Sequence, residues 1–362
     1  MSALLLLLTI GCTPRDTGAS PPKDSPVDTG TTDSPGETAE TDETSETAET
    51  ADTAETGHTG ETDDSDTGED TAPPPCDRTL GWSHVACGKH QTCGIHTDGC
   101  AECWGRGEEE DTGGYDTGGR YHWYGEDQPP AGTYVALAMN ASPIGPETPN
   151  ACGILDDGSG VCWGSNRLGV NDVPEGTFIE LAVWDEGAYG VGSDHVVQQW
   201  GYGYPPEGTF TSVATGEFSV VFLQEDGQLD QLSISGRTQE TAPPGTYVDI
   251  DIGDMYGCAI ATDGSILCWH TTDPENAEYE HLTTDAPIGD WVDVCNIVGA
   301  ACALDREGTA ACWDSTSPEI IPPSDEIFTK IACGAAHICG VTVDNRIVCW
   351  GWDVYGETTP PT

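Results

Sequence analysis

The sequence predicts an all-β fold built from repeated hairpins. Seven copies of one pattern follow residue 80, each with an apolar strand, a tight turn such as Asp-Gly, and a second strand that usually ends in Cys-Trp. The positions of this Trp lie 59, 37, 32, 37, 44 and 37 residues apart. A period of this size, made only of short strands and turns, indicates a β-propeller or a β-solenoid. The copies run from Cys93 to Trp104, Cys152 to Trp163, Tyr189 to Trp200, Val221 to Leu232, Cys258 to Trp269, Cys302 to Trp313 and Cys339 to Trp350.

A second motif precedes most copies and fixes where each unit begins. It consists of Pro followed by Gly, Thr and an aromatic residue, as in PPAGTY at Pro129, PEGTF at Pro174 and PPGTY at Pro243. Because proline cannot donate to a β-ladder, each unit is expected to start at this motif.

The spacing favours a closed ring over an open solenoid. Thirteen residues separate the Trp position from the next start in three copies, and thirteen residues beyond Trp350 gives position 363. The segment from Leu80 to Gly88, LGWSHVACG, resembles IFTKIACG from Ile327 to Gly334. The sequence therefore predicts a seven-bladed β-propeller in which the N-terminal strand completes the last blade and leaves no open edge.

Residues 1–12, MSALLLLLTIGC, form a signal segment that is too short to span a bilayer. The end of this segment resembles the bacterial lipobox, which implies that Cys12 is lipidated and becomes the mature N-terminus. Two features depart from that pattern, namely Thr9 in place of the usual Leu and the lack of a basic residue before the apolar run. A start site placed too late would explain the missing charge, and an incidental apolar start is the alternative.

Residues 13–75 hold 18 acidic and two basic residues among Thr, Ala, Gly, Ser and Pro. Such a segment has almost no apolar surface to bury and is expected to be a disordered stalk. The propeller is expected to occupy residues 76–362. In lipoproteins of this kind Thr13, rather than Asp, after the lipidated residue favours the bacterial outer membrane. We therefore expect a protein that contacts the membrane only through its lipid anchor and faces the cell surface or the periplasm.

Cysteine usage agrees with export from the cytoplasm. Ten of the 16 cysteines occupy the two Cys positions of the hairpin, and both positions change together in the copies that lack them. The two positions face each other across a short hairpin, at a separation that a disulfide can bridge. The predicted pairs are Cys93 with Cys103, Cys152 with Cys162, Cys258 with Cys268, Cys302 with Cys312, and Cys339 with Cys349.

The other mature cysteines have no pairing that the sequence determines. They are Cys76, Cys87, Cys100, Cys295 and Cys333. A disulfide between Cys87 and Cys333 is one possibility, because these two residues hold equivalent positions in units that would be neighbours across the ring closure. The odd count means that at least one thiol is free or pairs with another chain. Cysteines separated by nine residues do not have zinc-ligand spacing, so no metal site is expected.

The motifs VACGKHQTCGIHTDGCAECWG and IACGAAHICGVTVDNRIVCWG resemble the repeat of the regulator of chromosome condensation family, in its exported, cysteine-paired bacterial branch. This resemblance covers residues 80–362 and implies a seven-bladed propeller. The family includes a nucleotide-exchange factor for a small GTPase and a secreted inhibitor of β-lactamase, so the resemblance implies little about activity. His337 lies in the GAAHIC corner, where the family commonly has His, and a structural hydrogen bond is the expected role.

Charge and motifs exclude several functions. The net charge is -52, and the propeller region alone carries 45 acidic and nine basic residues, so nucleic acid is an unsuitable partner. A basic or cation-bridged protein or glycan fits better, and solubility alone is the alternative explanation of the charge. No EF-hand loop, Walker sequence or catalytic constellation is present, and Asp-Thr-Gly occurs only in low-complexity or Gly-rich sequence. We therefore expect no cofactor, no enzymatic activity and a monomer.

Insertions into the repeat provide the candidate binding residues. The largest insertion lies between Trp104 and Gly132, and shorter ones follow Leu137 and Trp269. Loops on a rigid scaffold carry recognition, and exposed aromatic residues are typical anchors, although an insertion without a partner is an equal alternative. The candidates are Tyr115, Tyr121, His122, Trp123 and Tyr124. They are expected on the face of the ring opposite the Asp-Gly turns.

Together these features predict a lipid-anchored, surface-displayed propeller that binds a protein or glycan and catalyses nothing. An inhibitor of an extracellular hydrolase is the alternative, followed by an extracellular lyase or glycosidase.

Overall fold

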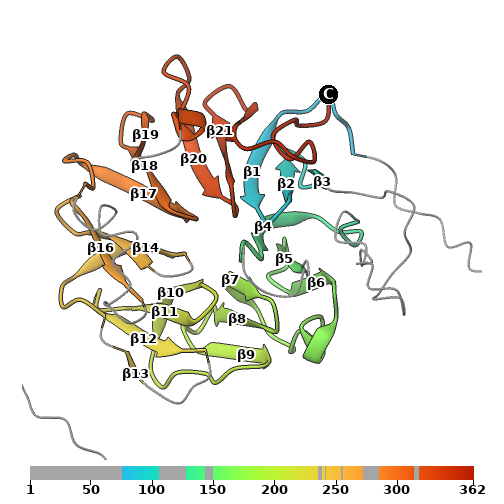
Figure 1. The fold of residues 1–362 in the computed structure, drawn as a ribbon. Helices are drawn as coiled ribbons and strands as arrows, with labels where there is room; N and C mark the ends of the chain where they lie inside the picture. Colours follow the sequence, from blue (N-terminus) through green and yellow to red (C-terminus); the bar gives the residue numbers. More distant parts are fainter. Residues whose placement is uncertain are drawn as a thin grey trace, which may run out of the picture. The chain divides into compact units, whose positions relative to one another are not determined.

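The protein folds into seven antiparallel sheets that follow one another around a ring (Figure 1), which confirms the all-β prediction. This is the arrangement of a seven-bladed β-propeller. No helix among the described residues is long and apolar enough to cross a membrane. The computed structural model describes residues 76–105, 128–142, 150–234, 239–240, 242–253, 256–271, 285–313 and 318–362.

Each blade consists of three consecutive strands, and blade 4 has a fourth. Blade 1 contains β1 (Trp82–Cys87), β2 (Gln91–His96) and β3 (Ala101–Gly105); blade 2, β4 (Tyr134–Met139), β5 (Asn150–Leu155) and β6 (Gly160–Gly164); blade 3, β7 (Phe178–Trp184), β8 (Gly187–Gly192) and β9 (Val197–Gly201); blade 4, β10 (Phe210–Thr215), β11 (Ser219–Gln224), β12 (Leu229–Ser233) and β13 (Gln239–Glu240); blade 5, β14 (Tyr247–Ile252), β15 (Tyr256–Ala261) and β16 (Ile266–His270); blade 6, β17 (Trp291–Ile297), β18 (Ala300–Asp305) and β19 (Ala310–Trp313); blade 7, β20 (Phe328–Cys333), β21 (His337–Thr342) and β22 (Ile347–Gly351).

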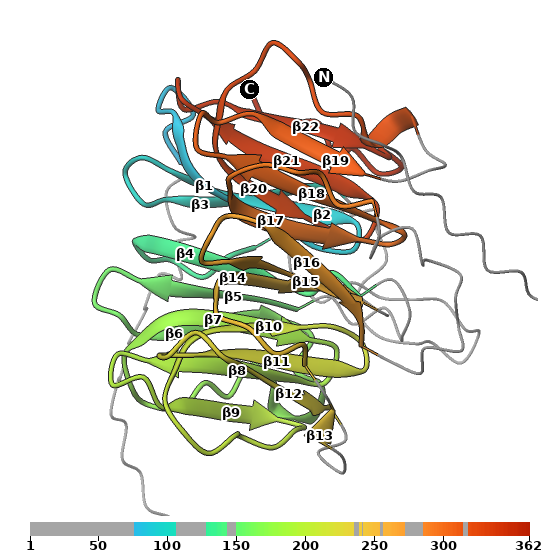
Figure 2. The same ribbon diagram turned by 90° about the vertical axis from the view of Figure 1, so that its left-hand side faces the viewer.

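Two short 3-10 helices, η1 (Arg167–Gly169) and η3 (Pro318–Ile320), follow the outer strands of blades 2 and 6. The first strand of each blade lies nearest the ring axis (Figure 1), and the strands cross the thickness of the ring when it is viewed from the side (Figure 2). We call the end of the ring that carries the second hairpin turns, such as residues 97–100, the turn face. The opposite end, which carries the first loops such as residues 88–90, is the loop face.

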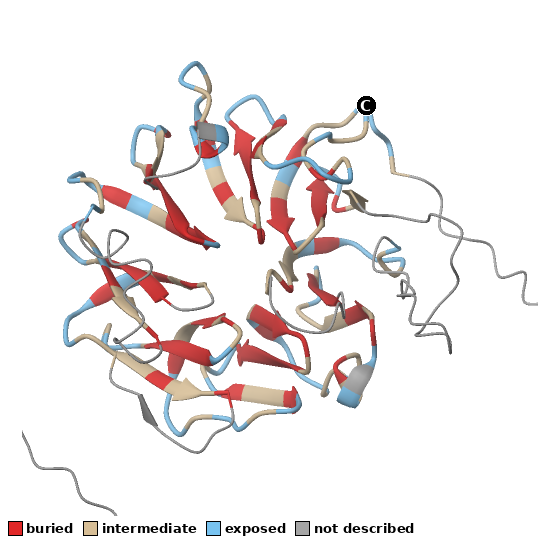
Figure 3. Ribbon diagram, viewed as in Figure 1, coloured by how far each residue is buried: buried red, intermediate tan, exposed pale blue. Residues whose placement is uncertain are grey.

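The two sequence motifs meet inside each blade. The aromatic residue of the start motif packs near the Trp that ends the outer strand, as in Tyr134 with Trp163, whose ring centroids are 5.9 Å apart. The middle strand between them carries a glycine, and a Cβ added to Gly153 would lie 2.6 Å from the Tyr134 ring. The Cys-Gly pair of the motif is therefore explained by close packing, because a larger residue would collide with the aromatic ring. Buried residues accordingly concentrate on the strands (Figure 3).

All five cysteine pairs expected within hairpins are disulfides in the structure. In each, the Cα atoms are 4.0 Å apart, and the two residues are direct partners across the middle and outer strands. In blade 4 the two cysteines are replaced by Val221 and Gln231, and the buried Gln231 accepts a hydrogen bond from Trp269 Nε1 at 2.9 Å. A polar side chain that contacts the next blade thus takes the place of a bridge within the hairpin.

Two further disulfides join residues that the sequence leaves unpaired. Cys76 bonds to Cys100, with Cα atoms 5.6 Å apart, and holds the start of the described chain against blade 1. Cys295 bonds to Cys333 and joins blade 6 to blade 7. The possible disulfide between Cys87 and Cys333 therefore does not form. Among the described cysteines Cys87 is the free thiol, and it is buried.

The register of the inner strands explains this difference. Cys295 is the fifth residue of its inner strand and meets Cys333, the sixth residue of the next inner strand. Cys87 is also a sixth residue, but the fifth residue of the preceding blade is Ala332. The seam between blades 7 and 1 therefore lacks the second half of a bridge that the neighbouring interface has.

The predicted closure by the N-terminal strand is wrong. β1 pairs with β2 in blade 1, and blade 7 has three strands of its own. The reason is the short loop, residues 88–90, which lets β1 form a local antiparallel hairpin in preference to a pairing with the far end of the chain. Blade 1 instead packs directly against β20 and β21 of blade 7, and the Trp82 N–H donates to Asn345 O at 2.7 Å.

The C-terminal segment after β22 adds a second connection across this seam. Glu357 O accepts hydrogen bonds from Thr92 Oγ1 at 2.8 Å and from Trp104 Nε1 at 3.0 Å, both in blade 1. The rings of Tyr355 and His90 lie 5.0 Å apart in an edge-on contact. The end of the chain therefore packs over the last and the first blades, as Figure 1 shows.

The substitution Ala332→Cys should form a disulfide with Cys87 and link blades 1 and 7. Its position matches that of Cys295 opposite Cys333, and Ala332 already packs against the apolar cluster that contains Cys87. Because the bridge would close a loop of most of the propeller, we expect a gain of about 2–4 kcal/mol in the free energy of unfolding. Denaturant unfolding in the presence and absence of reductant measures it, and Ala138→Cys, at an equivalent position in blade 2, is the control.

Candidate functional site

The inner strands surround a central channel, and their third residues hold equivalent positions around it. The third residue of each inner strand follows a register irregularity and belongs to a ring around the channel. These third-position residues, which we call the channel ring, are His84, Ala136, Glu180, Ser212, Asp249, Asp293 and Lys330. Five of the seven are ionisable, which is unusual for strands that are otherwise buried.

The channel ring bonds the blades to one another. Each inner strand has an edge without a neighbouring strand, and in blades 2, 4, 6 and 7 a side chain of the preceding blade accepts a hydrogen bond from its backbone. Asp249 accepts from the Val294 N–H at 3.0 Å and Asp293 accepts from the Ile331 N–H at 3.2 Å. His84 Nε2 accepts from the Leu137 N–H at 3.3 Å. The histidine is therefore an acceptor at Nε2 and is uncharged.

Glu180 and Asp251 complete the same pattern. Glu180 accepts from the Val213 backbone and from Ser212 Oγ at 2.9 Å, both in blade 4. Asp251, the fifth residue of its strand, accepts from the Asn296 N–H at 2.6 Å and from Asn296 Nδ2 at 3.2 Å. Four carboxylates therefore converge on the channel from blades 3, 5 and 6.

A cavity of about 470 Å³ occupies the channel on the side of the turn face. It is lined by His84, Glu180, Ser212, Asp249 and Lys330 of the channel ring, together with apolar residues. A second cavity, of about 240 Å³, continues inward past Asp251 and Asp293. The volume of the outer cavity is large enough for a side chain or a small organic group.

Burial among these strands perturbs the ionisation of the site. It raises the pKa of Glu180 and of Asp251 to about 7 each, despite the hydrogen bonds that both accept. Burial and the neighbouring Asp293 charge hold the pKa of Asp249 well above its usual range. The pKa of His84 is lowered to about 3 by burial and by the Lys330 charge. The channel thus holds acids that can take up or release protons near neutral pH.

Apolar side chains border part of the mouth of this cavity on the turn face, and we call them the apolar collar. It consists of second residues of the inner strands, which are exposed, namely Val135 at 56%, Ile179 at 48%, Val248 at 56% and Val292 at 38%. Ile179 and Val248 also line the outer cavity. A group that enters from this face therefore passes an apolar rim before it reaches the carboxylates.

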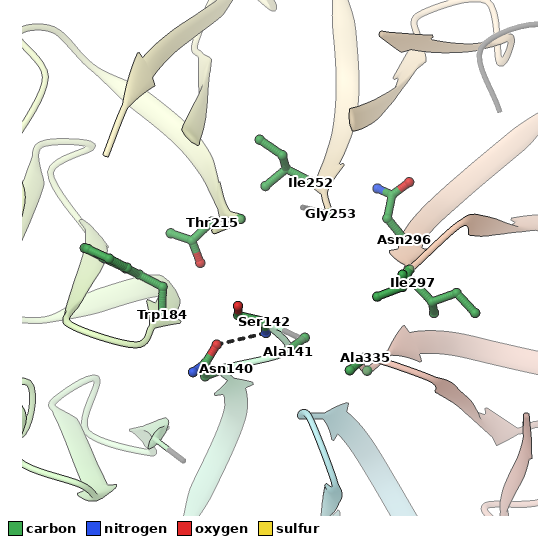
Figure 4. Close-up of a pocket in the computed structure, with 13 residues that line it drawn as sticks. Asn140, Ala141, Ser142, Trp184, Thr215, Ile252, Gly253, Asn296, Ile297 and Ala335 are labelled. Carbon is green, nitrogen blue, oxygen red and sulfur yellow. Dashed lines mark hydrogen bonds between the residues drawn. The ribbon is translucent and has the colours of Figure 1, made fainter. Parts of the chain in front are cut away.

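The opposite mouth, on the loop face, is narrower, and the described residues that line it are uncharged. Figure 4 shows the ends of the inner strands there, with Trp184, Thr215, Ile252, Asn296 and Ile297 around a cavity of about 30 Å³. The volume accommodates about one water molecule. The acidic channel is therefore accessible from the turn face.

Residues 328–357, which form blade 7 and part of the C-terminal segment, match the family model described as "Regulator of chromosome condensation (RCC1) repeat". The chain therefore contains a segment that is similar to an RCC1 repeat. None of the curated proteins compared with the chain matches it.

Solved structures resemble this propeller in fold. The CRINKLY WD40 ectodomain of the Arabidopsis thaliana receptor kinase ACR4 is 18% identical with a TM-score of 0.56, over 76% of this chain and 97% of that one. The ectodomain of the Physcomitrella patens receptor kinase CR4 is 18% identical with a TM-score of 0.51, over 60% of this chain and 63% of that one. Prp20p from Saccharomyces cerevisiae, whose binding properties to Gsp1p and histones are known, is 14% identical with a TM-score of 0.50, over 70% and 80%. At these identities the likeness concerns the fold alone.

The candidate residues predicted from the insertions lie outside the described part of this chain. They are Tyr115, Tyr121, His122, Trp123 and Tyr124, and the lipid-anchor candidate Cys12 lies outside it as well. His337 is fully buried, and its Nε2 lies 2.8 Å from Thr92 Oγ1 of blade 1, which gives it the structural role expected. Sequence reasoning missed the channel ring. The sequence pattern that could have identified it is the recurrence of ionisable residues at the third position of the inner strands.

The substitution Asp251→Asn should stabilise the protein at pH 8 and change little at pH 5. Asp251 has a pKa of about 7 in the folded state, above its ordinary value of 3.8, so the folded state binds the proton more tightly than the unfolded chain. The stability that this proton provides is lost as pH rises from about 4 to about 7, and Asn resembles the protonated acid. We expect a gain of about 1–3 kcal/mol at pH 8, measured by denaturant unfolding. An equal gain at both pH values would contradict the raised pKa, and the exposed Asp157→Asn is the control.

Proposed function

We propose that this protein is a non-catalytic binding propeller that takes a basic side chain of a partner protein into the channel from the turn face. The observation that carries the proposal is the outer cavity, in which Glu180 and Asp249 lie behind the apolar collar. A lysine or arginine side chain has matching chemistry, because its aliphatic stem can contact the collar while its charge reaches the carboxylates. The acidic propeller as a whole would attract such a partner.

Two comparisons support a protein partner over other ligands. The chain contains an RCC1 repeat, and Prp20p, which has a similar fold, has binding properties to Gsp1p and histones. Those named partners belong to Prp20p, and only the general role of a propeller that binds proteins extends to this chain. A glycan that carries a cationic group offers the same chemistry and is an outcome that the binding experiment distinguishes. Inhibition of an extracellular hydrolase remains a special case of this role.

An extracellular glycosidase is the second candidate, because several buried carboxylates with raised pKa values line one channel. The hydrogen bonds favour binding over catalysis. Each of the acids Glu180, Asp249 and Asp293 accepts a backbone hydrogen bond from the next blade, which is a structural role. Chromogenic glycosides provide the direct check, and we expect no turnover above that of the Glu180→Gln variant.

A lysine peptide and the same peptide with an acetylated lysine provide the binding test. Fluorescence anisotropy at pH 8 should show binding of the first and at least tenfold weaker binding of the second. The combined change Glu180→Gln and Asp249→Asn should weaken binding of the lysine peptide at least tenfold, whereas Asp157→Asn on the surface should not change it. Affinity should rise with pH through about 7, because a bound cation favours ionised carboxylates and Glu180 must release its proton.

The binding proposal fails if acetylation leaves the affinity unchanged. It also fails if the double variant binds as well as the unchanged protein. Amino-sugar oligosaccharides that bind while the peptides do not would identify a glycan instead.

We further propose that Cys12 is lipidated and displays the propeller from the bacterial outer membrane on the stalk of residues 13–75. The support is the lipobox-like end of residues 1–12 together with seven disulfides in the described residues, which are typical of exported proteins. The change Cys12→Ser should abolish labelling with a fatty acid and release the protein from the membrane fraction of a Gram-negative host. Retention of the variant in that fraction would contradict a lipid anchor.

A further inference from the structure

A free thiol and a disulfide face each other at the seam between blades 1 and 7. The sulfurs of Cys87 and Cys339 and a ring nitrogen of His337 lie within 4.8 Å of one another. Cys339 is bonded to Cys349, so it cannot serve as a thiolate ligand, and the three residues do not form a metal site in this state. The arrangement that remains is a thiol beside a disulfide, which are the two reactants of thiol–disulfide exchange.

The third residue of the cluster, His337, is neutral, because burial lowers its pKa to about 4. Thr92 Oγ1 donates its single hydrogen to Glu357 O at 2.8 Å, so it must accept from His337 Nε2, which lies 2.8 Å away. This fixes the proton on Nε2 and leaves a lone pair on Nδ1. His337 Nδ1 is buried and has no hydrogen-bond partner among the described residues. An unpartnered nitrogen in a buried site costs free energy, so the seam around Cys87 and Cys339 is less than fully stabilised.

We propose that Cys87, Cys339 and Cys349 form a thiol relay. The sulfur of Cys87 attacks the sulfur of Cys339, the Cys339–Cys349 bond breaks, and a Cys87–Cys339 bond forms. Cys349 leaves as a thiolate and takes up the proton that Cys87 has released. One disulfide is replaced by another, so the step requires no external oxidant or reductant.

Burial gives the relay a direction. Cys87 is 4% exposed and Cys339 is fully buried, whereas Cys349 on the outer strand β22 is partly exposed. The relay therefore moves the free thiol from an apolar interior to a site that water can reach, where its ionised form is better solvated. The new bridge also joins β1 to β21 across most of the propeller, whereas the old one closes a hairpin with a separation of 10 residues. A longer closed loop restricts the unfolded chain more.

Burial also keeps the relay inactive while the seam is closed. It raises the pKa of Cys87 to about 12, because Thr92 and the Cys339 backbone offset only part of the lost hydration. The attacking species is the thiolate, so reaction requires local opening that admits water. The contacts of the C-terminal segment with Thr92 and Trp104 cover this region. The result of opening would be a ring that is covalently closed at its seam and carries an accessible thiol on blade 7, available for a mixed disulfide with a partner.

Alkylation mapping of the full-length protein tests the relay. The folded protein is kept at pH 8 in urea below its unfolding transition, samples are alkylated over hours without reductant, and peptides are identified by mass. We expect growth of a Cys87–Cys339 linked peptide and of alkylated Cys349, at least tenfold above the level in the Cys87→Ser variant. The hairpin pair Cys258 and Cys268, in blade 5, should stay unlabelled in both proteins and is the internal control.

Two results would overturn the proposal. In one, Cys87 remains the labelled thiol and no Cys87–Cys339 peptide forms at any time. In the other, Cys349 is labelled equally in the Cys87→Ser variant, which would show that its disulfide is opened by something else. Thermal unfolding of Cys87→Ser checks that the variant is folded, and Cys87→Ala provides a second variant without a hydroxyl group. Neither result depends on the binding function of the channel.

Discussion

The inner edges of seven strands impose the main constraint on this fold. A blade pairs its three strands with one another, which leaves the N–H groups of its innermost strand facing the channel without a strand to accept them. Side chains of the preceding blade provide the acceptors, as Asp249 does for Val294 and Asp293 for Ile331. Each such contact joins two blades, so the same hydrogen bonds that satisfy the edges also fix the angle from one blade to the next.

The use of side-chain acceptors places carboxylates in the buried channel, and their burial affects what the channel can bind. A carboxylate that satisfies one backbone donor still has unused acceptor capacity, and several of them around one channel raise one another's pKa. The protein therefore keeps a group of acids that are partly protonated near neutral pH. A cationic group that enters past the collar would replace those protons. Structural and binding roles are thus compatible in the same residues, whereas catalysis would require carboxylates released from the backbone.

The sequence predicts the repeated part of the fold well. The start motif, the Cys-Gly pair and the terminal Trp occur together because their side chains stack within one blade, so their spacing reports a local contact such as Tyr134 with Trp163. The two hairpin cysteines are absent together from the same copies because, where they are present, they are direct cross-strand partners joined by a disulfide. The prediction that the N-terminal strand closes the ring within blade 7 was wrong. The spacing of the repeats gives only the number of residues between motifs, and this number is the same whether β1 pairs within blade 1 or joins blade 7. The channel ring was missed because charged residues at one register position become a cluster only when blades are arranged around an axis.

The seam shows how a repeat protein can acquire an asymmetric site without a new motif. At the interface of blades 6 and 7 the fifth and sixth inner-strand positions are both cysteine and form a bridge. At the interface of blades 7 and 1 the corresponding pair is Ala332 and Cys87, so one thiol remains. Because blade 7 also carries the hairpin disulfide Cys339–Cys349 beside this interface, the missing inter-blade partner leaves the Cys87 thiol close to Cys339. The difference between a static bridge and a reactive pair is then one side chain at position 332.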